Sequence, residues 1–169
     1  MVATDLLARP ATPGDCEAIA RIYNQGIDAR IATFETRHRT ADDIAAWLGT
    51  RYPVLVVTRN DEVVGFAAAS SYRPRDCYAG IAEYSVYVAN EAQGIGAGRT
   101  VLDALIVAAE EAGFWKLVSR IFPENVASLA LARKVGFREV GTYVKHAQLD
   151  GVWKDVAIVE RLLGPARDE

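Results

Sequence analysis

The sequence contains little cysteine, no long apolar run and no excess of positive charge. Its two cysteines, Cys16 and Cys77, are far apart and lack the Cys/His spacing of a zinc site, so we expect reduced thiols and no metal. No stretch approaches the roughly 18 apolar residues of a membrane span, and the first ten residues do not resemble a secretion signal. With 19 Lys and Arg against 22 Asp and Glu, the chain has no basic footprint for nucleic acid. These absences predict a cytoplasmic protein with no membrane or nucleic-acid partner.

Length and patterning predict a single domain. The 169 residues contain no internal repeat or low-complexity linker, so the chain fits one compact unit over residues 1–169. We expect its core to span about residues 7–163 and residues 164–169 to form a loose tail. Apolar runs bounded by turn residues predict strands at 6–10, 54–58, 63–69, 82–89, 116–121, 137–149 and 152–163.

Apolar residues at helical spacing predict four helices between these strands. Asp15 is the capping candidate for the first, and Thr40-Ala41-Asp42-Asp43 precedes the second. Asn60-Asp61 and Asp150-Gly151 predict the tight turns of two antiparallel hairpins. The apolar stripes of the expected helices run over residues 18–27, 44–48, 101–109, and from the cap Asn125 to the stop at Gly136.

A glycine-rich turn stands between the strand expected at 82–89 and the third helix. Glycines at 94, 96 and 98 leave backbone N–H groups open, and the following helix N-terminus favours negative charge. The turn therefore suits a pyrophosphate, with Arg99 beside it. A dinucleotide fingerprint would need glycine at position 99, and a nucleotide-triphosphate loop would need Gly-Lys followed by Ser or Thr. A plain glycine-rich connector is the remaining structural alternative.

Three motifs together resemble one known family. Gln93-x-x-Gly96-x-Gly98 follows the segment Ser85-Val86-Tyr87-Val88, and Asn125-x-x-Ser128 and Lys134-Val135-Gly136-Phe137 come later in the chain. Over about residues 7–163 the sequence resembles the GNAT family of acetyl-CoA-dependent acetyltransferases. The resemblance implies an α/β (α+β) fold, in which helices flank a mixed, mostly antiparallel central sheet. It also implies that the sheet is splayed where the pantetheine arm of the coenzyme inserts between strands.

The same resemblance implies an acetyl-CoA site without a metal. Backbone groups of Val86 and Val88 would hydrogen-bond the pantetheine arm, the turn at 94–99 would bind the pyrophosphate, and Asn125 would contact the coenzyme from the next helix. The cofactor-binding residues expected in this way are Val86, Tyr87, Val88, Gln93, Gly94, Ile95, Gly96, Ala97, Gly98, Arg99, Asn125 and Ser128.

Other motifs resemble one branch of that family. Ile22-Tyr23-Asn24, Thr33-Phe34-Glu35 and Arg75-x-x-Tyr78, followed by the segment 82–88, are similar to enzymes that acetylate phosphinothricin, methionine sulfoximine and arsinothricin. These acceptors are glutamate analogues. The resemblance implies a small amino-acid-like substrate, a role in resistance or detoxification, and a homodimer.

Glu83 is the expected general base. Acetyl transfer from a thioester to an amine requires the ammonium group to lose a proton, which a nearby carboxylate can take directly or through a water. Side chains alternate along a strand, so Glu83, Ser85 and Tyr87 share one face. A solvated or salt-bridged strand carboxylate is the alternative interpretation of Glu83. The resemblance also gives a backbone N–H of this strand the task of holding the thioester carbonyl.

The anionic end of an amino-acid acceptor needs a cation, and the planar fork of arginine suits it. Arg75 matches the branch, eight residues before Glu83, whereas Arg73 is equally consistent with a surface charge. Aromatic residues would enclose the aliphatic part of the acceptor, although they are core residues by default. The expected substrate-binding residues are Arg75, Arg73, Phe34, Tyr78, Ser85 and Tyr87.

Two positions depart from the family pattern. Ala132 stands where many members have a tyrosine that protonates the leaving thiolate. We therefore expect the thiolate to leave unprotonated, given a thiol pKa of about 8.5, or to take a proton from water. Trp153-Lys154-Asp155 lacks a histidine that some herbicide-resistance members have there. His38 and His146 are expected to be ordinary polar residues, and Cys77 is expected to have no role.

Two other functions fit parts of the sequence. A non-catalytic acyl-CoA-binding module would need only the coenzyme half, and an expected contact between Glu83 and Arg75 argues against it. An acetyltransferase for a protein N-terminus or a polyamine would keep the same chemistry. A polyamine would prefer an acidic pocket, which the arginines disfavour.

Overall fold

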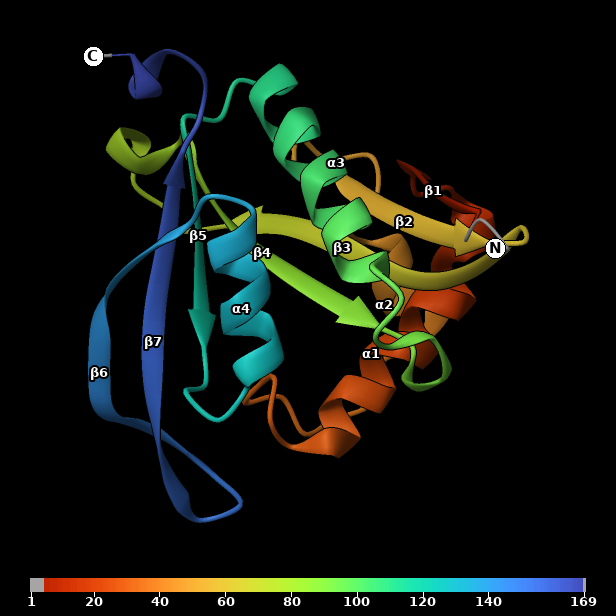
Figure 1. Cartoon of the computed structure of the whole chain (residues 1–169), viewed down its shortest axis with the longest axis horizontal. Helices are drawn as coiled ribbons and strands as arrows, with labels where there is room; N and C mark the ends of the chain where they lie inside the picture. Colours follow the sequence, from red (N-terminus) through yellow and green to blue (C-terminus); the bar gives the residue numbers. More distant parts are fainter. Residues whose placement is uncertain (1–4, 169) are drawn as a thin grey trace.

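The strands assemble into one mixed sheet. The computed structural model describes residues 5–168, in which seven strands follow the order β1-β2-β3-β4-β5-β7-β6. Figure 1 shows helices on both sides of this sheet, and the architecture confirms the expected fold class. The strands are β1 (Leu6–Pro10), β2 (Val54–Arg59), β3 (Glu62–Ser71), β4 (Ile81–Val88), β5 (Lys116–Ile121), β6 (Arg138–Leu149) and β7 (Val152–Leu162). The helices are α1 (Cys16–Ala29), α2 (Ala41–Ala45), α3 (Ala97–Glu111) and α4 (Val126–Lys134), with short 3-10 helices η1 (Pro13–Asp15), η2 (Asp76–Tyr78), η3 (Asn90–Ala92) and η4 (Gly164–Arg167).

Helices α3 and α4 cover one face of the sheet, and α1 covers the other. A Cβ built at Gly98 of α3 would lie 3.3 Å from Leu131 of α4 and 3.5 Å from Val88 of β4. A Cβ built at Gly26 of α1 would lie 2.5 Å from the Tyr87 ring. Neighbouring strand residues point to opposite faces, so these contacts place the two layers on opposite sides. Within residues 5–168, no helix combines the length and apolarity needed to cross a membrane.

The sheet opens between its two parallel strands. β4 and β5 run parallel, and their pairing ends at Glu83 and Val118. The other neighbouring strands pair antiparallel. Both parallel strands continue past this last pair and diverge, as Figure 1 shows. Ser119 Oγ donates a hydrogen bond to the Tyr84 carbonyl at 3.0 Å, so a side chain bridges the strands where they part. The opening confirms the expected splay.

Both expected hairpin turns are present. Asn60 and Asp61 have φ values of 51° and 67° between β2 and β3, and Asp150 and Gly151 have values of 49° and 77° between β6 and β7. Positive φ at both central residues is typical of the tight turn whose twist matches antiparallel strands. These two dipeptides therefore set the pairing next to each turn, and irregularities further along shift the register of both hairpins.

Two elements differ from the prediction. Helix α2 ends at Ala45, and the chain to Gly49 continues as turns rather than as the longer helix expected from the apolar stripe. Thr40 caps it, because its Oγ1 accepts the Asp43 N–H at 3.3 Å. The C-terminal tail, expected to be loose, forms η4, and the Gly164 N–H donates to Glu110 Oε1 at 3.2 Å. That partner lies on α3, so local sequence gave no signal for it.

Asp15 joins β1 to the start of α1. The sequence predicted Asp15 as the cap of α1, but its side chain makes no capping hydrogen bond to this helix. Instead its carboxylate accepts two hydrogen bonds from Arg9, at 2.7 and 2.9 Å, and one from the Thr12 N–H at 2.8 Å. The Arg9 hydrogen bonds and those of Thr12 lower the pKa of this buried carboxyl to about 2. The N-terminal edge strand is therefore tied to the helical layer by a charged, hydrogen-bonded cluster.

Replacing Asp15 by Asn should lower the free energy of unfolding by about 2 kcal/mol at pH 7, because the neutral amide loses its charge-assisted bonds to Arg9. The pKa in the folded state lies below the ordinary 3.8, so this stabilisation is complete above about pH 4 and disappears as the pH falls towards 2. Urea unfolding of both proteins at pH 7, 4 and 3 should show the difference shrinking with pH. A difference that stays constant would contradict this account.

Candidate functional site

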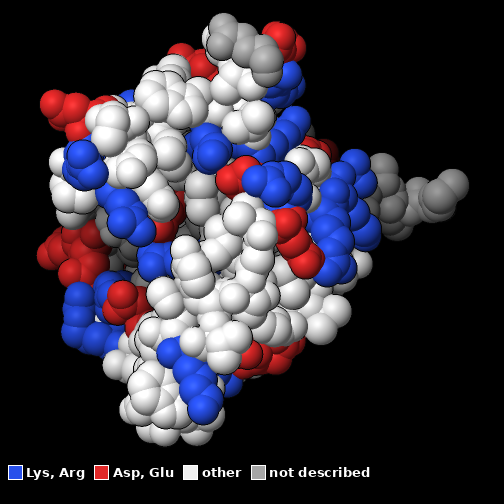
Figure 2. Space-filling model, turned by 90° about the vertical axis from the view of Figure 1, so that its left-hand side faces the viewer, with Lys and Arg blue, Asp and Glu red and all other residues white. Residues whose placement is uncertain are grey.

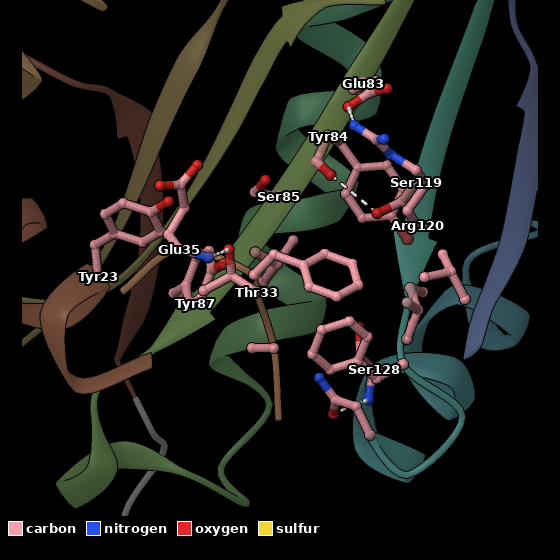
Figure 3. Close-up of a pocket in the computed structure, with 17 residues that line it drawn as sticks. Tyr23, Thr33, Glu35, Glu83, Tyr84, Ser85, Tyr87, Ser119, Arg120 and Ser128 are labelled. Carbon is pink, nitrogen blue, oxygen red and sulfur yellow. Dashed lines mark hydrogen bonds and ion pairs between the residues drawn. The ribbon is translucent and has the colours of Figure 1, made fainter. Parts of the chain in front are cut away.

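Two cavities meet beside the diverging end of β4. The first, which we name the splay pocket, has a volume of about 370 Å³ (Figure 3). The second, which we name the glycine groove, has a volume of about 570 Å³. The splay pocket is lined by Tyr23, Ala32, Thr33, Phe34, Glu35, Glu83, Tyr84, Ser85, Val86, Tyr87, Ser119, Arg120, Ile121, Phe122, Asn125, Ser128 and Val156. The glycine groove is lined by Gln25, Gly26, Ala29, Ile31, Ala32, Val86, Tyr87, Val88, Asn90, Ala92, Gln93, Gly94, Gly96, Ala97, Gly98, Arg99, Asn125, Ala127, Ser128, Ala130, Leu131 and Lys134. The residues common to both are Ala32, Val86, Tyr87, Asn125 and Ser128.

The glycine turn has the geometry of an anion cradle. Gly94 and Gly96 have φ values of 80° and 92°, and a Cβ at either would meet no atom within 4 Å, so the space above the turn is open. The first α3 hydrogen bond runs from the Thr100 N–H to the Gly96 carbonyl at 3.1 Å. The N–H groups of the helix residues before Thr100 are therefore free of intrahelical partners. Such a helix start fits a diphosphate.

The backbone of β4 faces the opening at alternate residues. The Tyr84 carbonyl accepts from β5, whereas the Ala89 N–H donates to the Val64 carbonyl of β3. Successive residues of a strand direct their N–H and C=O groups to opposite neighbours. Val86 and Val88 share the direction of Tyr84, so their backbone groups face the space that β5 has left. The site therefore offers polar backbone groups where the resemblance expects the pantetheine arm.

Asn125 and Ser128 join the two cavities from the start of α4. Asn125 caps this helix, and its Oδ1 accepts the Ser128 N–H at 3.3 Å. The bond uses the oxygen of the amide and leaves the Nδ2 group outside the cap. Gln93, the turn residues and Arg99 line the groove as expected, whereas Ile95 is not among its lining residues and packs against the core.

Glu83 and Arg120 form an ion pair in the splay pocket. Arg120 Nη2 lies 2.9 Å from Glu83 Oε2, and Figure 3 shows the two side chains pointing toward each other across the gap between β4 and β5. The Glu83 side chain is 21% exposed and that of Arg120 is 53% exposed. Glu83 is registered with Val118, so Arg120, two residues further along β5, lies on the same face. The expected base is thus present in the pocket, held by a cation.

Arg120, and not Arg75 as expected, pairs with Glu83. Arg75 precedes η2, and its guanidinium lies 5.8 Å from the centre of the Tyr78 ring. Arg73 similarly lies 5.2 Å from the Tyr72 ring. None of Arg73, Arg75 and Tyr78 lines either cavity. Both arginines are exposed in the loop between β3 and β4, outside the pocket.

Aromatic side chains and the loop after α1 enclose the splay pocket. Phe34 packs edge-on against Phe122 at 4.8 Å, and Tyr87 packs edge-on against Tyr23 at 5.0 Å. Burial raises the pKa of the Tyr87 phenol far above its ordinary range, so this hydroxyl stays protonated. Arg30, at the end of α1, pairs with Asp150 at 3.1 Å and ties this loop to the β6–β7 turn. Phe34 and Tyr87 thus occupy the expected wall.

The positions that depart from the family pattern lie at the edge of the site or outside it. Ala132 is fully buried and lines neither cavity. Lys154 pairs with Glu124 at 2.7 Å and lies 5.8 Å from the Phe122 ring centre. His38 pairs with Asp28, and His146 stacks on Tyr143; neither histidine lines the pocket.

Several polar residues of the splay pocket were not predicted from the sequence, among them Ser119, Arg120 and Glu35. Ser119 and Arg120 belong to the expected strand 116–121, but the local sequence does not show which strand pairs with it, so their position in the pocket was not predicted. Glu35 appeared only as part of a motif. In the structure its carboxylate lines the pocket and pairs with Arg39 at 2.7 Å. The alternation of side chains along β5 could have placed Arg120 on the face of Glu83, but only if the parallel register of β4 and β5 had been known.

Comparisons with known proteins agree with this architecture. Residues 5–138 match the acetyltransferase (GNAT) domain family. The L-methionine sulfoximine/L-methionine sulfone acetyltransferase of Pseudomonas aeruginosa is 34% identical over 167 residues, which cover 94% of this chain and 95% of that protein. A phosphinothricin N-acetyltransferase of Streptomyces coelicolor is 31% identical, covering 94% of this chain and 97% of that protein.

Solved structures show the same fold. The structure of yncA from Salmonella typhimurium with its cofactor acetyl-CoA has a TM-score of 0.90 and 32% identity, and the match covers 95% of both chains. A ribosomal-protein-alanine N-acetyltransferase from Brucella melitensis has a TM-score of 0.88 and 37% identity, and the match covers 93% of this chain and 99% of that one. The chain therefore belongs to the GNAT family. It is an acetyl-CoA-dependent N-acetyltransferase.

Replacing Gly96 by Ala should weaken coenzyme A binding at least about 10-fold, because the added methyl group enters the open space above the turn and strains the backbone that presents its N–H groups. Isothermal titration calorimetry with coenzyme A measures the effect. Gly151→Ala is a matched control, since Gly151 also has positive φ and open space around a Cβ but lies in the β6–β7 turn. Both variants should lose about 1 kcal/mol of stability. Equal coenzyme affinity in the two variants would refute the assignment.

Proposed function

We propose that this enzyme acetylates the amino group of a small amino acid of the glutamate-analogue type, such as phosphinothricin, methionine sulfoximine or arsinothricin. The observation that carries the proposal is a carboxylate, Glu83, in a pocket of about 370 Å³ that shares five lining residues with the glycine groove. A pocket of this size suits a single amino acid. The names of the two curated relatives support the same class of acceptor.

In the proposed mechanism the protein holds both substrates and moves one proton. The coenzyme supplies an acetyl thioester, whose C–S bond breaks, with its electron pair leaving on sulfur, as the acceptor nitrogen forms the amide bond. The turn at 94–99 and Asn125 hold the coenzyme, and the backbone groups of Val86 and Val88 orient its arm. Glu83 takes the first proton from the ammonium group, directly or through a water, and the second proton leaves the nitrogen for water as the amide forms. With Ala132 in place of an acid, the thiolate leaves unprotonated or takes a proton from water.

Acetylation replaces a charged ammonium group by a neutral amide. A toxic glutamate analogue would lose the cation by which amino-acid-binding sites recognise it. We therefore propose a role in resistance or detoxification. The relative named for ribosomal-protein alanine is the reason to include a peptide acceptor in the test, since a protein N-terminus carries the same nucleophile.

Glu83→Gln should lower kcat by roughly 10²–10⁴-fold, because the amide cannot accept the proton of the acceptor. Release of the coenzyme thiol, followed with a thiol reagent, measures turnover with phosphinothricin, methionine sulfoximine, arsinothricin, spermidine and an alanine-terminated peptide. The wild-type enzyme should prefer the three amino acids.

Glu139→Gln is the matched control, because Glu139 also pairs with an arginine, Arg133, but lies outside both cavities. It should leave turnover unchanged. A Glu83→Gln enzyme that binds coenzyme A normally and turns over at the wild-type rate would remove Glu83 as the base. Turnover confined to the peptide or to spermidine would replace the proposed acceptor, and the absence of any turnover would favour a binding module.

We also propose that the chain forms a homodimer through the β6–β7 ribbon, defined as residues 138–162. This ribbon exposes Val140 (48%), Tyr143 (53%), Val144 (72%), Val152 (58%) and Trp153 (55%). β6 is an edge strand, and Figure 1 shows the hairpin projecting beyond the other strands. Figure 2 shows uncharged atoms around a group of Lys and Arg side chains at the lower end of the molecule. Exposed apolar side chains gathered on an edge are typical of a protein interface.

Val144→Asp should convert a dimer into a monomer, because it places a charge among the apolar side chains of this ribbon. Light scattering after size-exclusion chromatography should give twice 18.4 kDa for the wild type and 18.4 kDa for the variant. Val107→Asp, at an exposed valine of α3, is the control and should remain dimeric. A monomeric wild type would contradict the proposal.

A further inference from the structure

The splay pocket contains one cation and two carboxylates. Among the described residues that line it, Arg120 is the single Lys or Arg, and Glu35 and Glu83 are the acids. Arg39, from outside the lining, pairs with Glu35 at 2.7 Å. Arg120 and Glu83 are therefore the charged groups of the pocket that face each other without a further ion-pair partner among residues 5–168.

The Arg120 guanidinium has donors to spare. Its hydrogen bond to Glu83 uses Nη2 and Oε2, at 2.9 Å, and its side chain is 53% exposed. A guanidinium carries five N–H donors in a planar fork, which matches a carboxylate in a bidentate arrangement. The guanidinium can therefore donate hydrogen bonds to a second carboxylate, or exchange Glu83 for one. Because the side chain is already exposed, neither change requires a buried group to move.

We infer that Arg120 binds the α-carboxylate of the acceptor and that this exchange releases Glu83 to accept the ammonium proton. The inference rests on the proposed function, an amino-acid acceptor. In an α-amino acid the carboxylate and the ammonium group are attached to the same carbon, and Arg120 and Glu83 offer their opposite charges side by side. The acceptor zwitterion thus replaces one ion pair by two.

This exchange makes the availability of the Glu83 carboxylate depend on the acceptor. With an amine that has no carboxylate, such as a polyamine, Arg120 stays paired with Glu83, and Glu83 Oε2 is not free to take a proton. An amino acid frees Glu83 Oε2 as it binds. Arg120 is therefore a specificity-determining residue, in the place that the sequence analysis had given to Arg75.

The test compares one amino acid accepted by the wild type with its α-carboxamide, for example methionine sulfoximine and its amide. Arg120→Gln should raise the KM of the acid about 10–100-fold, the loss expected for a charge-assisted bidentate bond. The preference for the acid over the amide, as a ratio of kcat/KM, should fall to near one. The kcat for the amide should not fall, because the variant no longer holds Glu83.

Calorimetry adds a readout independent of turnover. The affinity of the acid for the coenzyme-A-bound variant should fall in parallel with KM, while the affinity for coenzyme A stays unchanged. Arg120→Lys should recover part of the acid preference, since an ammonium group restores the charge but not the fork. Arg133→Gln, which removes the exposed guanidinium paired with Glu139, is the matched control and should retain wild-type values.

Each outcome decides the matter. An Arg120→Gln enzyme that keeps the wild-type KM and acid preference overturns the inference, and loss of that preference in Arg75→Ala instead assigns the carboxylate to Arg75. In both cases the proposed function stands, because the wild type still acetylates the amino acid. A wild-type enzyme that acetylates no amino acid overturns the proposed function and this inference together.

Discussion

The site depends on the place where β4 and β5 stop pairing. Parallel pairing through Glu83 and Val118 fixes the two strands at one end, and their divergence beyond this pair leaves the backbone groups of Val86 and Val88 directed at open space. Unpaired backbone polar groups are costly inside a sheet unless a ligand, water or side chain satisfies them. Ser119 supplies one such bond at the point of divergence. A gap in the ladder thus leaves polar backbone groups available to a ligand.

The chemistry of the site follows from the same geometry. The last registered pair places Glu83 at the edge of the opening, and alternation along β5 brings Arg120 beside it. The glycine turn lies at the far end of β4, where α3 begins. One strand therefore connects the charged pocket with the anion cradle, and its central residues contribute to both. This arrangement suits a reaction between two bound molecules better than one that needs a covalent enzyme intermediate.

Much of the fold could be predicted because its signals are local. The dipeptides Asn60-Asp61 and Asp150-Gly151, the glycine turn and the cap Asn125 each specify a backbone conformation by themselves, and the structure has all of them. The part of the glycine groove formed by residues 86–99 was predictable for the same reason, since it is one continuous segment, whereas the part formed by residues 25–32 was not. The splay pocket was predicted only in part, because it joins β4, β5 and the loop after α1. Arg120 enters it through a parallel register, and Arg75 stays outside it although it precedes the same strand.

The five residues common to the splay pocket and the glycine groove include both ends of the first turn of α4, Asn125 and Ser128. The two spaces therefore share this part of their lining. In the proposed mechanism, a coenzyme bound in the glycine groove would add its own atoms to the boundary of the splay pocket. The recognition surface for the proposed acceptor would then be a composite of chain and coenzyme, of which the polypeptide by itself carries an incomplete version.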